Sequence, residues 1–257
     1  MADHLIEHWP EEDICCLRLN RPEKYNALSS ALTDDLHAAM AGINERGARV
    51  LLLTANGKGF CAGADLSERK TMSDDRKFAH NRAISGLADD IAALPFPTIA
   101  GLNGLALGGG CEIALACDLR FMVANAKIGL TEARIGAIPG AGGTQRLPRL
   151  IGTARALEMM YSGEPIDAGQ AETWGLVNRT FPDAAAMEAA MLGFARLVSQ
   201  RSRRGMQLLK SVVYAGLDLP IAEGLDGERI AISEILRSRD YREGVCAFAE
   251  RRSPVFD

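Results

Sequence analysis

Strand-like and helix-like segments alternate through the first third of the chain, and this alternation restricts the fold more than any other feature. Residues 14–19 and 49–55 are short apolar runs typical of buried strands. Between them, residues 30–45 carry apolar side chains at helical spacing: Leu32, Leu36, Ala39, Met40 and Ile43. We expect Ser30 or Thr33 to cap this helix. The strand–helix–strand order favours parallel pairing and predicts an α/β fold.

The carboxy-terminal half has a different pattern. Further strands are expected over residues 98–104, 119–124 and 127–132, but after about residue 148 the pattern predicts helices alone. These helices are expected over residues 155–163, 167–175, 184–202, 203–216 and 221–238. The last of them are too few to bury their own apolar faces, so we expect them to pack on a neighbouring surface.

Composition limits the partners and the compartment. A net charge of −4 does not favour binding to nucleic acid or to an anionic membrane, so we expect neither as a partner. The six cysteines form no CxxC pair, the amino terminus has no apolar signal segment, and we expect reduced thiols in the cytoplasm. Residues 91–111 are uncharged and long enough to span a bilayer, but two prolines and five glycines would break a helix there, so we expect no membrane span. The four histidines lack metal-ligand spacing, which predicts no metal site.

A run of three glycines, Gly108, Gly109 and Gly110, precedes a glutamate in the otherwise apolar residues 103–119. Glycines lose much backbone freedom on folding, so this run indicates either tight backbone packing or an exposed helix N-terminus. The free N–H groups of such a terminus suit an oxygen that develops negative charge. Glu112 has no polar helix face to occupy, so we expect a buried carboxylate with a chemical task.

Another glycine-rich segment follows the strand predicted over residues 49–55. Gly57, Gly59 and Ala62 match the spacing of a dinucleotide-binding turn, but Asp65 is better explained as a helix N-cap, so we favour an ordinary loop. Gly63 and the residue after it are small enough to let a ligand approach backbone N–H groups closely.

Glu132 has a setting similar to that of Glu112, because a further glycine-rich segment, residues 140–143, follows it. An ion pair with an arginine is one explanation, and the candidates are Arg134, Arg146 and Arg149. The alternative is that Glu112 and Glu132 together hold one water molecule for acid–base chemistry.

Five segments closely resemble the crotonase, or enoyl-CoA hydratase/isomerase, family. In chain order they are LNRPEKYNALS, FCAGADL, NGLALGGGCEIALACDLR, IGLTEARIGAIPGAGGTQRLPRLIG and EGVCAFAERR. The resemblance implies a spiral of ββα units over residues 1–195 and a helical trimerisation region over residues 196–257, assembled as a trimer or as a hexamer of two trimers. The sequence of residues 61–69 and 105–110 most resembles the methylglutaconyl-CoA hydratase branch of this family.

The resemblance also implies an activity and a set of site residues. The expected enzyme is a 2-enoyl-CoA hydratase of fatty-acid β-oxidation type, which acts on an acyl-CoA thioester and needs no other cofactor. The family's oxyanion hole maps onto the backbone N–H groups of Ala64 and Gly109. Its two glutamates map onto Glu112 and Glu132, which would orient a water for attack at C3, and Glu132 would exchange the proton at C2.

The CoA-binding residues that the resemblance implies are Lys24, Tyr25, Ala62, Gly63, Ala64, Asp65, Leu66, Gly109, Gly140 and Arg251. Arg251 stands where family members often carry a lysine. Two alternatives to a hydratase remain. An enoyl-CoA isomerase would need one base and no paired water site, and a noncatalytic acyl-CoA- or RNA-binding relative would not need both glutamates.

Overall fold

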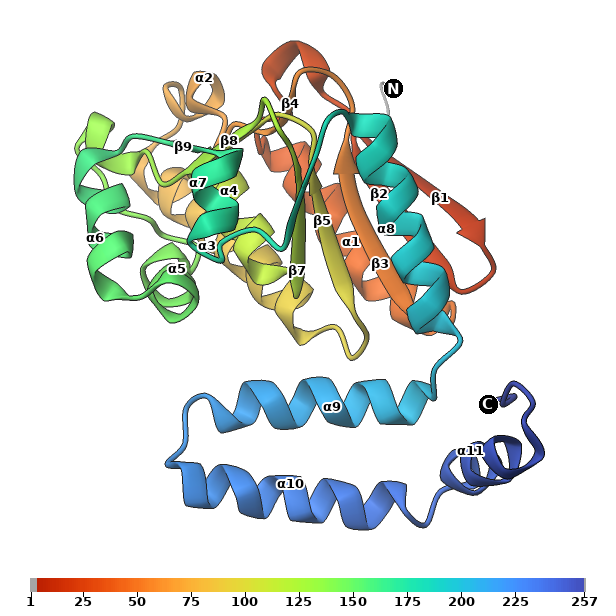
Figure 1. The fold of residues 1–257 in the computed structure, drawn as a ribbon. Coiled ribbons are helices and arrows are strands. Elements are labelled where there is room, and N and C mark those ends of the chain that lie inside the picture. Colours follow the sequence, from red (N-terminus) through yellow and green to blue (C-terminus); the bar gives the residue numbers. More distant parts are fainter. Residues whose placement is uncertain (1–3, 257) are drawn as a thin grey trace.

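The computed structural model describes residues 4–256, which form two β-sheets, the helices around them and a helical arm (Figure 1). The larger sheet has the order β1 (Leu5–Glu11), β2 (Ile14–Leu19), β3 (Val50–Ala55), β5 (Thr98–Leu102), β7 (Leu119–Val123) and β10 (Arg179–Phe181). The smaller sheet has the order β4 (Gly59–Cys61), β6 (Leu105–Leu107), β8 (Lys127–Gly129) and β9 (Ile166–Asp167). Neighbouring strands are parallel except in the β1/β2 and β8/β9 pairs, so the α/β prediction is confirmed.

Repeats of strand, strand and helix wind the chain between the two sheets. Each repeat gives its first strand to the larger sheet, its second to the smaller sheet, and then a helix. The three repeats are β3–β4–α3 (Asp74–Ala93), β5–β6–α4 (Gly109–Ala116) and β7–β8–α5 (Gly143–Ile151). Short helical turns precede two of these helices, α2 (Leu66–Arg69) and η2 (Glu132–Ile135). The predicted spiral of ββα units is therefore confirmed.

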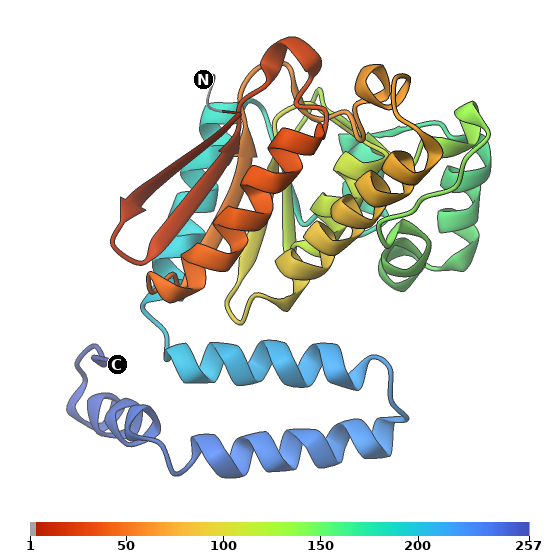
Figure 2. The ribbon, with the colours of Figure 1, turned by 180° about the vertical axis from the view of Figure 1, so that it is seen from behind.

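Helices cover both faces of the larger sheet. Helix α8 (Ala184–Ser199) lies on one face, and α1 (Ser30–Glu45) and α3 lie on the other (Figures 1 and 2). Every residue of β3 is buried as a result, which explains its nearly continuous apolar sequence. Two short helices, α6 (Thr153–Ser162) and α7 (Ala168–Thr173), and the turn η1 (Pro22–Lys24) complete the core.

Two sequence-based expectations about element ends are wrong in detail. Helix α1 has the predicted extent, but Ser29 is its N-cap, because its side chain accepts the Leu32 N–H at 3.3 Å. The hydroxyls of Ser30 and Thr33 have other partners, since Ser30 donates to Glu68 at 2.7 Å and Thr33 donates to the Ser29 carbonyl at 2.8 Å. The strand expected over residues 127–132 ends at Gly129, so Glu132 begins η2 instead.

The last three helices form an arm outside the core: α9 (Arg203–Gly216), α10 (Ile221–Ile235) and α11 (Arg239–Glu250) (Figures 1 and 2). Asp118, just before β7, ties α9 to the core. Its carboxylate accepts bonds from Lys210 Nζ at 2.9 Å and Tyr214 Oη at 2.8 Å. The expected packing of the tail on a neighbouring surface is thus found for α9.

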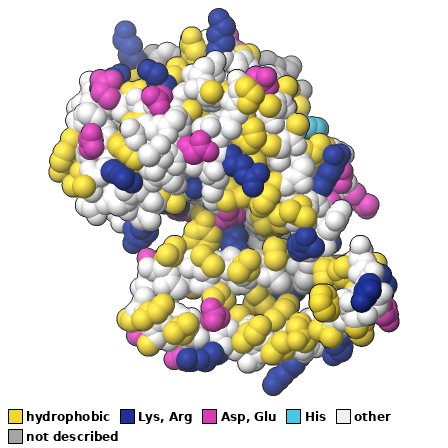
Figure 3. All heavy atoms as spheres, viewed as in Figure 1, with side chains coloured by type: hydrophobic (Ala, Val, Ile, Leu, Met, Phe, Trp, Pro, Cys, Tyr) yellow, Lys and Arg dark blue, Asp and Glu magenta, His cyan; other side chains and the backbone are white. Residues whose placement is uncertain are grey.

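Apolar side chains on the arm remain exposed within the chain (Figure 3). They include Leu209, Val213, Leu217, Ile221, Ile230, Leu236, Val245 and Phe248. No helix within residues 4–256 is both long enough and apolar enough to cross a bilayer.

Candidate active site

Three successive repeats of the spiral contribute to one cavity of about 140 Å³. It lies where β4, β6 and β8 of the smaller sheet lead into α2, α4 and η2. The cavity brings together most of the predicted site residues: Ala62, Gly63, Ala64, Leu66, Gly109, Glu112, Glu132 and Gly140. The sequence motifs therefore converge in space although they are up to about 80 residues apart.

Two backbone N–H groups that line this cavity have no acceptor among the described residues 4–256. Gly109 is the first residue of α4, where an N–H has no acceptor in the preceding turn. The neighbouring N–H groups of Ala62 and Asp65 donate to Tyr25 and Leu28, but no acceptor within residues 4–256 takes the N–H of Ala64. A Cβ atom added to Gly109 would lie 3.6 Å from the Ala64 nitrogen, so the two amides are adjacent. This is the geometry of a paired donor site for one oxygen.

The glycines around these amides are required by close backbone approach. Gly63 has φ +88°, and a Cβ there would lie 2.8 Å from the Leu107 carbonyl oxygen. A Cβ on Gly110 would lie 2.1 Å from the Cys61 carbonyl oxygen. Both explanations of the glycine run therefore apply: Gly110 permits tight backbone packing, and Gly109 exposes its N–H at the helix N-terminus.

Replacing Gly110 with Ala should lower the free energy of unfolding by about 3 kcal/mol, because the new methyl group collides with backbone that cannot move aside. Gly109→Ala is the matched control, since its Cβ would make contacts no closer than 3.5 Å. Urea unfolding of the two variants measures the difference. Equal stability of both would contradict this account of the run.

Glu112 is held in place by the start of another helix. Its Oε1 accepts the N–H groups of Ala141 at 2.7 Å and Gly143 at 2.8 Å, and the residue is only 3% exposed. Burial raises the pKa of Glu112, and these N–H groups oppose part of the rise. The expectation of a buried glutamate is confirmed, and backbone N–H groups fix the direction of its carboxylate in the cavity.

Glu132 has no ion-pair partner within residues 4–256, so the ion-pair explanation is wrong. The three candidate arginines pair elsewhere: Arg134 with Glu164, Arg146 with Asp89, and Arg149 with Asp218. The Oε2 atom of Glu132 is buried without a hydrogen-bond partner in the same described range. Burial raises the pKa of Glu132 to about 7; a backbone hydrogen bond lowers it and the charge of Glu112 raises it further. A carboxyl group with this pKa can hold or release a proton near neutral pH.

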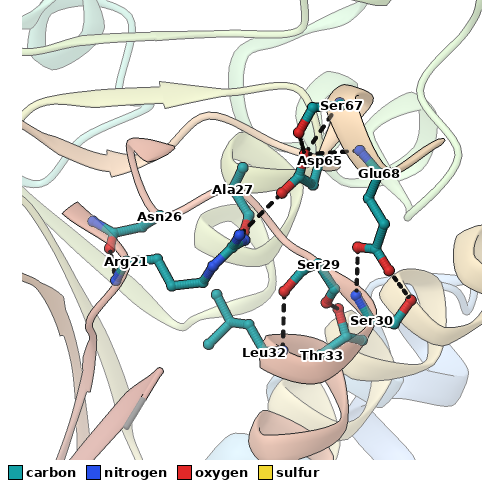
Figure 4. Close-up of polar contacts among 10 residues, drawn as sticks. All are labelled: Arg21, Asn26, Ala27, Ser29, Ser30, Leu32, Thr33, Asp65, Ser67 and Glu68. Atoms are coloured by element: carbon teal, nitrogen blue, oxygen red, sulfur yellow. Dashed lines mark hydrogen bonds and ion pairs between the residues drawn. The ribbon is translucent and has the colours of Figure 1, made fainter. Parts of the chain in front are cut away.

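A polar network fixes the loop that carries Ala64 (Figure 4). Arg21 donates to the Ala27 carbonyl at 2.6 Å and to Asp65 at 3.1 Å, and Asp65 caps α2 by accepting the N–H groups of Ser67 and Glu68. Glu68 in turn accepts the Ser30 N–H at 3.0 Å at the start of α1. Burial raises the pKa of Asp65, but the hydrogen bonds outweigh it and the pKa lies below its usual range.

Asp65 is therefore an N-cap, as its position indicated, and its carboxylate is engaged within the fold. The dinucleotide-turn reading is wrong, because Gly59 belongs to strand β4 and Gly57 packs on Pro22. Lys24, Tyr25 and Arg251 do not line the cavity within this chain. Arg251 lies at the end of α11 in the arm, and Tyr25 lies 46% exposed beside Gly59.

Gly108, from the glycine run, also lines the cavity, and the sequence did not single out the remaining lining residues: Arg69, Asn81, Ile84, Thr131, Ile135, Ala137, Ile138 and Ala141. Several come from α2 and α3, whose mixed charge pattern is typical of a solvated helix. No group of three His, Cys, Asp or Glu side chains within residues 4–256 is placed to hold a metal ion.

Comparison with known proteins agrees with this geometry. The sequence model of a family described as Enoyl-CoA hydratase/isomerase matches residues 10–257. The chain belongs to the enoyl-CoA hydratase/isomerase family. It is 40% identical over 252 residues to the mouse Enoyl-CoA hydratase domain-containing protein 2, mitochondrial, covering 96% of this chain and 85% of that one.

Two further members of the enoyl-CoA hydratase/isomerase family show how far the likeness extends. Mouse Methylglutaconyl-CoA hydratase, mitochondrial, is 37% identical over 258 residues, covering 98% of this chain and 82% of that one. The crystal structure of an enoyl-CoA hydratase from Bacillus anthracis superposes with a TM-score of 0.96 at 38% identity, covering 99% of both chains. The likeness therefore includes the arm as well as the spiral core.

Proposed function

We propose that this family member is a 2-enoyl-CoA hydratase, which adds water reversibly across the 2,3 double bond of an acyl-CoA thioester to give a 3-hydroxyacyl-CoA. One observation carries the proposal: two backbone amides without an acceptor in residues 4–256, the buried Glu112 and the half-buried Glu132 share one cavity. No cofactor beyond the CoA of the substrate is required by this chemistry.

The mechanism follows from where charge develops. The thioester oxygen would accept the N–H groups of Ala64 and Gly109, which stabilise the negative charge as the enolate forms. Ionised Glu112 would take a proton from a water molecule as its oxygen attacks C3. Glu132, protonated up to a pH of about 7, would deliver a proton to C2. In dehydration the two glutamates exchange roles.

An enoyl-CoA isomerase is the second candidate, because the family's description includes it. Moving a double bond needs one proton carrier, and Glu132 alone could supply it. The anchored position of Glu112 supports the hydratase, since its backbone bonds hold a second carboxylate in the same cavity as Glu132.

Hydration of crotonyl-CoA tests the proposal directly. The purified protein should remove the enoyl absorbance with saturation kinetics and give 3-hydroxybutyryl-CoA. A 3-enoyl-CoA substrate provides the comparison. Conversion of the 3-enoyl-CoA without hydration of crotonyl-CoA or any other 2-enoyl-CoA, carboxylated ones included, would assign the protein as an isomerase.

We also propose that the arm assembles the protein into trimers or pairs of trimers, because nothing in residues 4–256 covers the exposed apolar side chains of α9–α11. Assembly could bring Arg251 of the arm toward a CoA site. Five of the six free cysteines are buried, which suits a reducing compartment such as the cytoplasm.

A further inference from the structure

Arg69 is a cation in the candidate active site that the hydration mechanism does not use. It is the last residue of α2, and it lines the same cavity as Glu112 and Glu132. The other residues that line this cavity are apolar, small, neutral polar or acidic. Its positive charge therefore requires a separate explanation.

The guanidinium is held firmly but is not neutralised. Its Nε donates to Nδ1 of His80 at 3.1 Å, and His80 is only 5% exposed. Burial lowers the pKa of His80, which favours the neutral imidazole that can accept this bond. Both Nη groups lack a hydrogen-bond acceptor within residues 4–256, and no carboxylate in that range forms an ion pair with Arg69. One edge of the guanidinium is thus fixed while the other is available.

This arrangement is unfavourable for a substrate with a purely hydrocarbon chain. Burial lowers the pKa of Arg69, and the charge of Glu112 only partly opposes this. An apolar chain in the cavity would remove water from the free Nη groups without replacing its hydrogen bonds. A carboxylate can accept both Nη groups at once, which is the strongest pairing available to arginine.

We propose that Arg69 binds a carboxylate on the acyl chain, so that the preferred substrate is a short 2-enoyl-CoA whose chain ends in a carboxyl group. The inference rests on the proposed hydratase function and names its substrate class. Glu112 and Glu132 would repel an anionic chain, and Arg69 offsets that repulsion inside the same cavity.

The size of the cavity fits a short chain. Its volume is about 140 Å³, and an apolar cavity of about 150 Å³ in another protein holds one benzene molecule. Five or six carbon-sized atoms therefore fill a space of this volume.

The alternative role for Arg69 is that of a counter-charge that tunes the two glutamates. That role would change turnover of charged and uncharged substrates alike, and it would shift the pH profile. A carboxylate-binding role instead changes the ratio of kcat/KM for a carboxylated substrate to kcat/KM for an uncharged one. The ratio is therefore the quantity to measure.

Glutaconyl-CoA and 2-pentenoyl-CoA form a matched pair, because both have five acyl carbons and one carries the terminal carboxylate. The wild type should favour glutaconyl-CoA in kcat/KM by about 30-fold, the value of a charge-assisted hydrogen-bonded pair. Arg69→Met should abolish this ratio, and Arg69→Lys should keep part of it. Arg76→Met, an exposed arginine of α3 outside the cavity, should leave the ratio unchanged. An equal ratio in wild type and Arg69→Met overturns the proposal.

Binding of saturated analogues separates this proposal from the hydratase assignment. Glutaryl-CoA should bind the wild type more tightly than valeryl-CoA by calorimetry, and Arg69→Met should remove the difference. Hydration of 2-pentenoyl-CoA and glutaconyl-CoA with equal kcat/KM would overturn the carboxylate site but would still support the hydratase assignment. Tighter binding of glutaryl-CoA through Arg69 without any hydration supports the anion site and overturns the hydratase.

Discussion

Glu132→Gln should lower kcat for hydration of a 2-enoyl-CoA about 1,000-fold, because the amide retains the shape of the side chain but cannot transfer a proton to C2. The affinity for a saturated acyl-CoA should change far less, since no bound group of the ground state is removed. Steady-state kinetics gives the first quantity and calorimetry with butyryl-CoA gives the second. Near wild-type turnover would show that another group carries the proton.

The pH profile of the wild type identifies the same group. Glu132 must be protonated for hydration and has a pKa of about 7 in the free protein, so kcat/KM should fall as the pH rises above about 7. Dehydration of a 3-hydroxyacyl-CoA needs the ionised form, so its kcat/KM should fall as the pH drops below about 7. The residual activity of Glu132→Gln should lack this titration. A limb near pH 7 that persists in Glu132→Gln would assign it to a different residue.

Gly109→Pro should lower kcat about 100- to 1,000-fold, because it replaces one of the two oxyanion donors with a ring carbon. The substitution suits the backbone otherwise: Gly109 is the first residue of α4, where proline is favoured. An added Cβ there makes only ordinary contacts. The variant should therefore fold, which circular dichroism and thermal unfolding would check.

Gly109→Ala is the control for this prediction, because it adds the Cβ atom and keeps the N–H. It should lose far less activity than Gly109→Pro when both are assayed with the same enoyl-CoA. Similar losses in the two variants would mean that shape, rather than the amide donor, limits turnover.

The parts of the fold that could be predicted from the sequence are those with strong local signals. Helix α1 and strands β2 and β3 follow from apolar spacing that is decided within a few residues. Strand β1 was missed because it is an edge strand, with charged residues and Pro10 in place of an apolar run. Strands β4 and β6 are three residues each, too short for any period to show.

The site was predictable where a residue type conflicts with its surroundings. A buried carboxylate such as Glu112 costs desolvation free energy, and glycines at a helix start cost backbone entropy. Either cost indicates a function or a close backbone contact. Arg69 gives no such signal, because arginine in a stretch of mixed charge is typical of a solvated surface. Only the three-dimensional arrangement shows that α2 turns this side chain into the cavity, and the N-cap of α1 likewise depends on the contact between Ser30 and Glu68.

The distribution of the site over the spiral links ligand binding to complete winding of the chain. Ala64 follows β4, Gly109 and Glu112 follow β6, and Glu132 follows β8, so each of three turns supplies at least one group. An intermediate in which one of these turns is unfolded lacks part of the site, so a substrate analogue should not bind to it. The population that such an analogue detects is therefore the fully wound protein, and the analogue should raise the midpoint of unfolding in proportion to the logarithm of its concentration.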